Sequence, residues 1–186
     1  MFENIIKNVH NRHPLIHCIT NYVSINDCAN IVLACGGAPI MAEDINEVSQ
    51  ITSICQGLDI NIGMLNDNKL SSMLKAGATA NELGIPVILD PVGAGSSDYR
   101  IKAVQNLMSN VQFGVIRGNV SEIKAIAEKQ GIHNIAAGVY ETMQKNKSAM
   151  GVEAGIADKI TDDNIKEMAD FINKLSQKTG AVIAVT

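Results

Sequence analysis

The residues best suited to chemistry stand in one short stretch, Asp90-Pro91-Val92-Gly93-Ala94-Gly95-Ser96-Ser97. The apolar run before it, residues 85–89, predicts a buried strand that ends at the carboxylate. A carboxylate there lies where open α/β sheets bind ligands, and the glycines let backbone N–H groups approach an anion. Such an acid could hold a cation that in turn holds phosphate oxygens. The alternative is a turn that carries a solvated Asp90, and spacing alone slightly favours it.

A second polar stretch, Arg117-Gly118-Asn119-Val120-Ser121-Glu122, follows the next predicted strand. Asn119 and Glu122 are three residues apart, which predicts a capping box at the start of a helix. A capping box alone would explain the presence of these two residues at this spacing. The functional interpretation places Glu122 at a helix start that faces the same crevice as Asp90, with Arg117 as a forked donor to phosphate.

The elements that must position these residues alternate along the chain. Apolar runs predict strands, and amphipathic segments between them predict helices, so we expect right-handed βαβ units and a mostly parallel sheet with helices on both faces. The predicted strands are residues 13–21, 38–42, 58–63, 85–89, 111–116 and 181–186. The predicted helices are residues 2–11, 24–34, 48–54, 69–83, 99–109 and 165–179. No linker divides the 186 residues, which predicts a single domain.

Composition limits the partners of the protein. The net charge of −4 argues against nucleic acid and acidic membrane surfaces, and no apolar run approaches the roughly 18 residues of a membrane span. With no signal peptide pattern either, a cytoplasmic, thiol-reduced protein is expected.

Cysteine and histidine spacing predicts no metal site. The four cysteines include no CxxC pair, so neither a zinc site nor a redox pair is indicated, and Cys28 and Cys35 are expected to serve as small buried hydrophobes. His13 and His17 have a helical metal-ligand spacing, but Pro14 argues against a helix there.

Several stretches together resemble hydroxyethylthiazole kinase, a thiamine-salvage enzyme family with a ribokinase-like three-layer fold. The likeness runs over residues 1–130 and resumes at about residue 151. The stretches that carry it include Pro14-Leu15-Ile16-His17-Cys18-Ile19-Thr20-Asn21-Tyr22-Val23, Pro39-Ile40-Met41-Ala42, Asn61-Ile62-Gly63, Leu89-Asp90-Pro91-Val92-Gly93-Ala94-Gly95 and Val115-Ile116-Arg117-Gly118-Asn119-Val120-Ser121-Glu122-Ile123. Several motifs in the right order are far more specific than any one of them.

The resemblance implies ATP- and Mg²⁺-dependent phosphorylation of the hydroxyl of 4-methyl-5-(2-hydroxyethyl)thiazole by a cytoplasmic homotrimer with pockets at its subunit contacts. It also implies a role for eight residues at matching positions. Met41, Asn21 and Gly63 would contact the thiazole; Arg117, Asn119 and Thr186 would bind ATP; Asp90 and Glu122 would position magnesium, directly or through waters.

The sequence departs from the family in two places. The family continues beyond the segment that Thr186 would open, to a Gly-rich anion hole whose cysteine lies beside the substrate hydroxyl, so no catalytic residue of the family falls within this sequence. We therefore expect an incomplete ribokinase-like domain, truncated at its C-terminal end, with little activity of its own. Residues 131–150 are expected to be an insertion. The alternatives are an inactive remnant that binds thiazole or only oligomerises, and a related enzyme with another small substrate.

Overall fold

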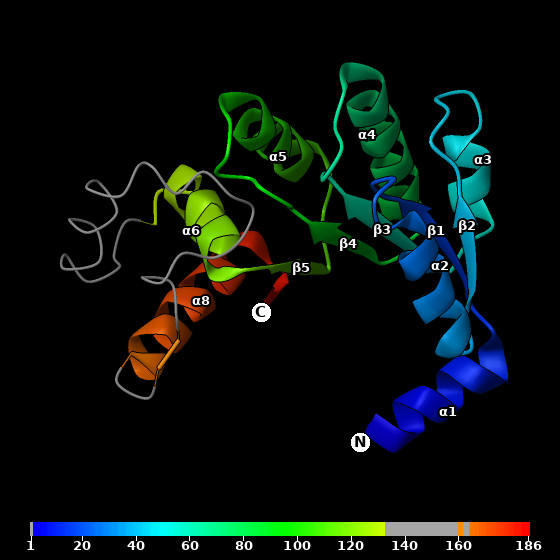
Figure 1. Cartoon of the computed structure of the whole chain (residues 1–186), viewed down its shortest axis with the longest axis horizontal. Helices are drawn as coiled ribbons and strands as arrows, with labels where there is room; N and C mark the ends of the chain where they lie inside the picture. The colour runs from blue at the N-terminus through cyan, green and yellow to red at the C-terminus, as the bar shows by residue number, and fades with distance from the viewer. Residues whose placement is uncertain (1, 133–159, 162–163) are drawn as a thin grey trace.

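Six parallel strands form the centre of the protein in the order β2-β1-β3-β4-β5-β6 (Figure 1). The computed structural model describes residues 2–132, 160–161 and 164–186. The strands are β1 (Leu15–Ile19), β2 (Ala38–Met41), β3 (Gly57–Asn61), β4 (Val87–Asp90), β5 (Val115–Gly118) and β6 (Val182–Val185). Every pairing of neighbours is parallel, which confirms the expected α/β class and its parallel sheet.

Helices connect these strands and lie on both faces of the sheet. They are α1 (Phe2–Arg12), α2 (Ile25–Ala34), α3 (Val48–Ser53), α4 (Asp67–Glu82), α5 (Asp98–Asn110), α6 (Val120–Lys129) and α8 (Ile165–Thr179). Figure 1 shows α3, α4 and α5 on one face and α2 on the other. This division follows from right-handed crossovers, because the chain moves one way from β1 to β2 and the other way from β2 onward.

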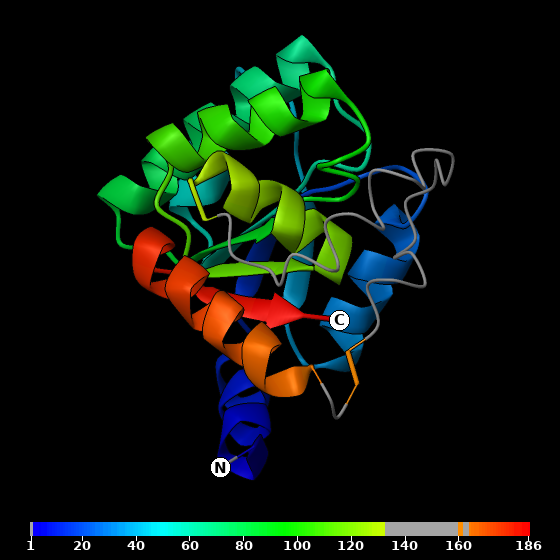
Figure 2. The ribbon, with the colours of Figure 1, turned by 90° about the vertical axis from the view of Figure 1, so that its left-hand side faces the viewer.

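The alternation of side chains along the strands separates a buried face from a half-covered one. Leu58, Ile60, Leu89 and Ile116 point toward α4 and α5 and are at most 1% exposed. On the α2 side, Ile88 is 41% and Val182 63% exposed, so α2 covers only part of that face. Figure 2 shows β6 at the edge of the sheet with α8 alongside it.

One predicted strand starts in the wrong place. The sequence predicts extended ladder structure over residues 111–116, but β5 begins at Val115. The Asn81 side chain bonds the backbone N–H and C=O of Gln112, which removes this segment from the ladder. Val111 instead packs on α4, so closely that a Cβ on Gly77 would lie 2.5 Å from Val111 Cγ2. The other predicted elements appear within a few residues of their expected bounds.

Two further expectations concern the ends of this fold. Most of the predicted insertion, residues 131–150, lies outside the described residues. None of the helices that the structure describes is long and apolar enough to cross a membrane.

Candidate functional site

A hydrogen-bonded chain of polar side chains crosses the carboxyl ends of four neighbouring strands. Asn21, just after β1, donates from Nδ2 to Asn61 Oδ1 at 3.1 Å. Asn61, the last residue of β3, donates from Nδ2 to Asp90 Oδ2 at 3.0 Å, and Arg117 of β5 lies 3.4 Å from the same oxygen. The chain therefore includes three of the predicted site residues and adds Asn61. It passes between β1 and β3, where the strand order reverses and open α/β sheets bind ligands.

Asp90 is a half-buried acid at the centre of this chain. Its side chain is 19% exposed, and burial raises the pKa of Asp90, while Arg117 lowers it and the nearby Glu122 carboxylate raises it. Two acids close together in a partly desolvated place favour a bound cation, because a cation relieves their repulsion. The turn interpretation is thus incomplete: Asp90 is partnered and half-buried, not solvated.

Gly63 completes the β3 side of the site through a close approach. A Cβ at Gly63 would lie 2.9 Å from Asn61 Oδ1 and 3.0 Å from Asn21 Nδ2, so only glycine fits between the two amides. The structure therefore brings two of the predicted thiazole contacts, Asn21 and Gly63, together.

Glu122 has the architectural role that its spacing predicts. The capping box is formed, because Asn119 Oδ1 accepts from the Glu122 N–H and Glu122 Oε2 accepts from the Asn119 N–H. Its other oxygen, Oε1, accepts from the Gly93 N–H at 2.8 Å, so this buried side chain also ties the loop after Asp90 to α6. A carboxylate has about four acceptor positions, which leaves room for a water of a metal ion.

Asp90 and Glu122 fit a Mg²⁺ ion by their chemistry. Mg²⁺ is held by one or two carboxylates together with phosphate oxygens and water, and these two acids repel one another electrostatically at the Gly-bearing turn. Asp90 would be the more direct ligand, since both Glu122 oxygens already accept backbone N–H groups.

The ends of β5 and β6 form the other side of the site. Thr186 follows β6, and its N–H donates to the Gly118 carbonyl at 3.1 Å, next to the capping residue Asn119. The three residues predicted to bind ATP, Arg117, Asn119 and Thr186, therefore lie on adjacent strand ends, and 53% of the Arg117 side chain is exposed.

Met41 lies apart from the polar chain, in a cavity of about 130 Å³ after β1 and β2. Cys18, Ile25 and Tyr22 also line it. At its rim, the buried Lys69 ammonium pairs with Glu43 at 2.8 Å and lies 4.6 Å from the Tyr22 ring centre, and Tyr22 also bonds Glu43. The cavity is small and partly apolar.

Arg100 is a structural residue of the site that sequence reasoning missed. From α5, its guanidinium donates to the carbonyls of Ile62 and Gly63 after β3, and to that of Val92 after β4. One side chain thus fixes both loops that border the polar chain.

Replacing Arg100 should loosen this arrangement. Arg100→Met leaves three loop carbonyls without their donor, so the free energy of unfolding should fall by about 2–3 kcal/mol in urea denaturation. Lys102→Met, at an exposed position of the same helix, is the matched control and should have little effect. Equal losses in both variants would contradict the role of Arg100.

His17 is a buried core residue and does not share a site with His13. Its Nε2 lies 2.8 Å from the Ala42 carbonyl and its Nδ1 2.9 Å from Thr52 Oγ1. His13 instead bonds the Gly36 carbonyl. Because a carbonyl only accepts, the proton of neutral His17 is on Nε2, and the bond joins β1 to the residue after β2. Burial lowers the pKa of His17, which keeps it neutral near pH 7.

The His17 pKa predicts acid sensitivity. The unfolded chain binds this proton near pH 6.5 and the folded chain only at lower pH, so the free energy of unfolding should decrease as the pH falls below about 6.5. Urea denaturation at pH 7.5 and 5.5 should show a smaller decrease for His17→Gln than for the unsubstituted protein. His10→Gln, at an exposed position, should keep the original decrease; an unchanged pH dependence in His17→Gln would refute the assignment.

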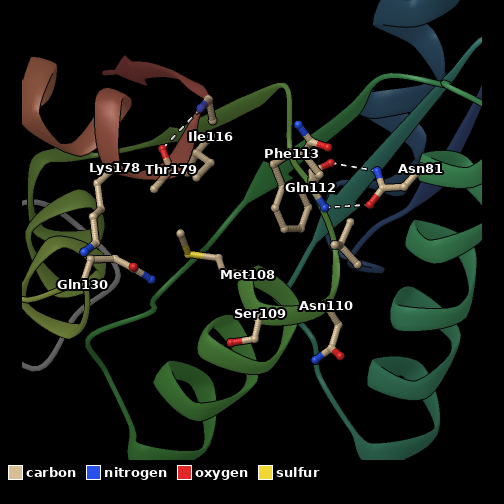
Figure 3. Close-up of a pocket in the computed structure, with 12 residues that line it drawn as sticks. Asn81, Met108, Ser109, Asn110, Gln112, Phe113, Ile116, Gln130, Lys178 and Thr179 are labelled. Carbon is tan, nitrogen blue, oxygen red and sulfur yellow. Dashed lines mark hydrogen bonds between the residues drawn. The ribbon is translucent and has the colours of Figure 1, made fainter.

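A larger hollow lies at the opposite edge of the sheet. Its volume is about 460 Å³, and residues at the C-terminal ends of α5 and α6, among them Met108, Asn110 and Gln130, line it (Figure 3). The predicted site residues do not line it. It adjoins the amino ends of the strands, where parallel sheets do not present their ligand-binding loops, so size does not identify the site here.

The fold defines an open-sheet α/β protein with a candidate ligand site at the carboxyl edge of its strands. Residues 6–162 match the model of the hydroxyethylthiazole kinase family, and the chain belongs to that family. It is 52% identical over its whole length to the hydroxyethylthiazole kinase of Clostridium acetobutylicum and 44% identical to that of Desulfovibrio desulfuricans. The solved structure of a hydroxyethylthiazole kinase protein from Pyrococcus horikoshii superposes with a TM-score of 0.78 at 30% identity over 98% of this chain.

The chain spans about 60% of the length of these relatives. It covers 62% of the Clostridium protein, 60% of the Desulfovibrio protein and 59% of the Pyrococcus chain. The matches to the family model, to these relatives and to the solved structure confirm the family and the three-layer fold expected from the sequence motifs. The roles of the individual site residues stay predictions.

Proposed function

We propose that the protein transfers the γ-phosphoryl group of ATP to the hydroxyl of hydroxyethylthiazole, with Mg²⁺, in cytoplasmic thiamine salvage. The observation that carries this proposal is the polar chain from Asn21 through Asn61 and Asp90 to Arg117. It lies between a small cavity on the β1–β2 side and the strand ends on the β5–β6 side, as a site for two substrates requires.

The proposed role of each residue follows from its position in the site. Met41 and its cavity would hold the thiazole ring, and Asn21 with Gly63 would fix the end that carries the hydroxyl. Asp90 and Glu122 would hold Mg²⁺, which neutralises charge on the phosphates when bound. Arg117 keeps donors free beyond its contact with Asp90, and they would orient the phosphate that is transferred.

The test is phosphoryl transfer by the protein. Incubation with ATP, MgCl₂ and hydroxyethylthiazole should form the phosphate ester, detected by mass spectrometry, together with ADP. A panel of other small alcohols serves as the control for specificity. Preferential phosphorylation of another alcohol would favour a related enzyme and contradict the thiazole assignment.

A second candidate is a thiazole-binding protein that transfers no phosphate. The cavity at Met41 could bind a thiazole ring whether or not phosphate is transferred. Isothermal titration with hydroxyethylthiazole separates the two candidates. Binding without ester formation supports the second, and absence of both contradicts each.

We also propose that the chain forms a single domain and that this domain assembles as a homotrimer. The α2 side of the protein exposes Ile31, Leu33, Ile88 and Val182, an apolar set that an interface would cover. Sedimentation velocity should therefore give a mass near three chains. A monomer at micromolar concentration would contradict the trimer.

A further inference from the structure

Two cysteines and a carboxylate from three different elements lie close together on the face of the sheet that α2 covers. They are Cys18 of β1, Cys28 of α2 and Asp59 of β3, and one ligand atom of each lies within 4.8 Å of the other two. The β1–β3 register pairs Cys18 directly with Asp59, so both side chains point to the face that α2 covers. Cys28 Sγ lies 4.0 Å from Asp59 Oδ2. The sequence spacing gave no sign of this cluster, because its members are distant in sequence and form no CxxC motif.

The cluster has no cation in direct contact with its carboxylate. Within the described part of the chain, no Lys, Arg or His forms an ion pair with Asp59, and the charge of Arg117 lowers the pKa of Asp59 only in part. Burial raises the pKa of both thiols, and burial together with the charge of Asp90 raises the pKa of Asp59 to about 6. Three acids thus face one another in a partly desolvated place, where a metal ion would stabilise their ionised forms.

We propose that Cys18, Cys28 and Asp59 bind a thiophilic divalent cation, with Zn²⁺ as the best match. Thiolates select zinc over magnesium, and a carboxylate oxygen is an accepted third ligand. A tetrahedral zinc with bonds of about 2.3 Å holds its sulfurs roughly 3.8 Å apart, so ligand shifts of about 1 Å are sufficient. The site is separate in kind from the Asp90 and Glu122 pair, which offers only hard oxygen ligands.

The Met41 cavity borders one of the three proposed ligands. Cys18 and Ile25 line that cavity, so an ion held by Cys18 could take a water ligand from it. Helix α2 has no fully buried residue, so bound zinc would tie a weakly packed helix to β1 and β3. The melting temperature should therefore rise when Zn²⁺ is added, and Cys28→Ser should show a smaller rise.

Co²⁺ titration tests the site directly, because thiolate ligands give Co²⁺ an intense charge-transfer absorption. We expect saturation near one equivalent, displacement by Zn²⁺ and none by millimolar Mg²⁺. Cys28→Ser and Asp59→Asn should each lower the affinity for Co²⁺ by at least about tenfold. Cys35→Ser is the matched control, since Cys35 ends the same helix but is exposed, and it should bind as the unsubstituted protein does. Full binding by Cys28→Ser would overturn the proposal.

A second measurement needs no variant and so does not depend on variant folding. The reduced protein is treated with a maleimide with and without Zn²⁺, and the labelled peptides are quantified by mass spectrometry. Zn²⁺ should slow labelling of Cys28 at least about tenfold and leave Cys35 unchanged. Equal labelling of Cys28 with and without Zn²⁺ would overturn the site, and because the assay contains no thiazole or ATP, its failure leaves the kinase proposal untouched.

Discussion

Asp90→Asn should lower the rate of phosphoryl transfer by at least about 10²–10³-fold while leaving the protein folded. The amide keeps an oxygen that can accept from Asn61, but it loses the negative charge that would hold Mg²⁺. Because burial raises the pKa of Asp90, removing its charge should not reduce the free energy of unfolding at pH 7. Loss of activity without loss of stability would identify Asp90 as functional and not merely a turn residue.

A control variant and a measurement of nucleotide binding test this prediction further. Asp98→Asn, an exposed acid after the same loop, should retain activity and stability. The affinity for a fluorescent ATP analogue in the presence of Mg²⁺ should fall in Asp90→Asn but not in Asp98→Asn, a readout that does not require turnover. Unchanged nucleotide affinity and unchanged rate in Asp90→Asn would contradict the magnesium assignment.

Glu122→Gln should differ from Asp90→Asn in its stability and destabilise the protein by about 2–3 kcal/mol. Both carboxylate oxygens accept from backbone N–H groups, those of Gly93 and Asn119. An amide places an NH₂ donor against one of these donors, so a buried N–H loses its acceptor. The loop after Asp90 and the start of α6 should loosen together.

Urea denaturation measures this loss. Glu128→Gln, at an exposed position of the same helix, is the matched control and should change the free energy of unfolding by less than about 0.5 kcal/mol. If Glu122→Gln were as stable as this control, the link between the capping box and the Gly93 loop would be wrong.

The sequence predicted most of the fold because local signals decided it. Apolar runs and glycine terminators located the elements, and the Asn119–Glu122 spacing predicted a capping box that is fully formed. The strand at residues 111–116 was misplaced because its backbone bonds to the Asn81 side chain, 31 positions away along the chain. No local pattern contains that contact.

Only part of the candidate site could be predicted, because local patterns identify the ends of strands but not contacts between distant segments. Asp90, Asn21 and Arg117 end strands that the sequence identifies, and parallel strands bring their carboxyl ends to one edge. Asn61 carried a usable signal, as a polar residue closing an apolar strand before Gly63. Arg100 carried none, since its role depends on two loops meeting beside α5.

The most direct test of the proposed site is where hydroxyethylthiazole binds. Titration of the ¹⁵N-labelled protein, followed by two-dimensional NMR, should shift the amide signals of Ala42, Glu43 and Gly63, at the carboxyl ends of β2 and β3. The signals of Gln112 and Thr179, which line the larger hollow in Figure 3, should stay in place. Shifts confined to that hollow would contradict the site at the carboxyl edge and with it the proposed function.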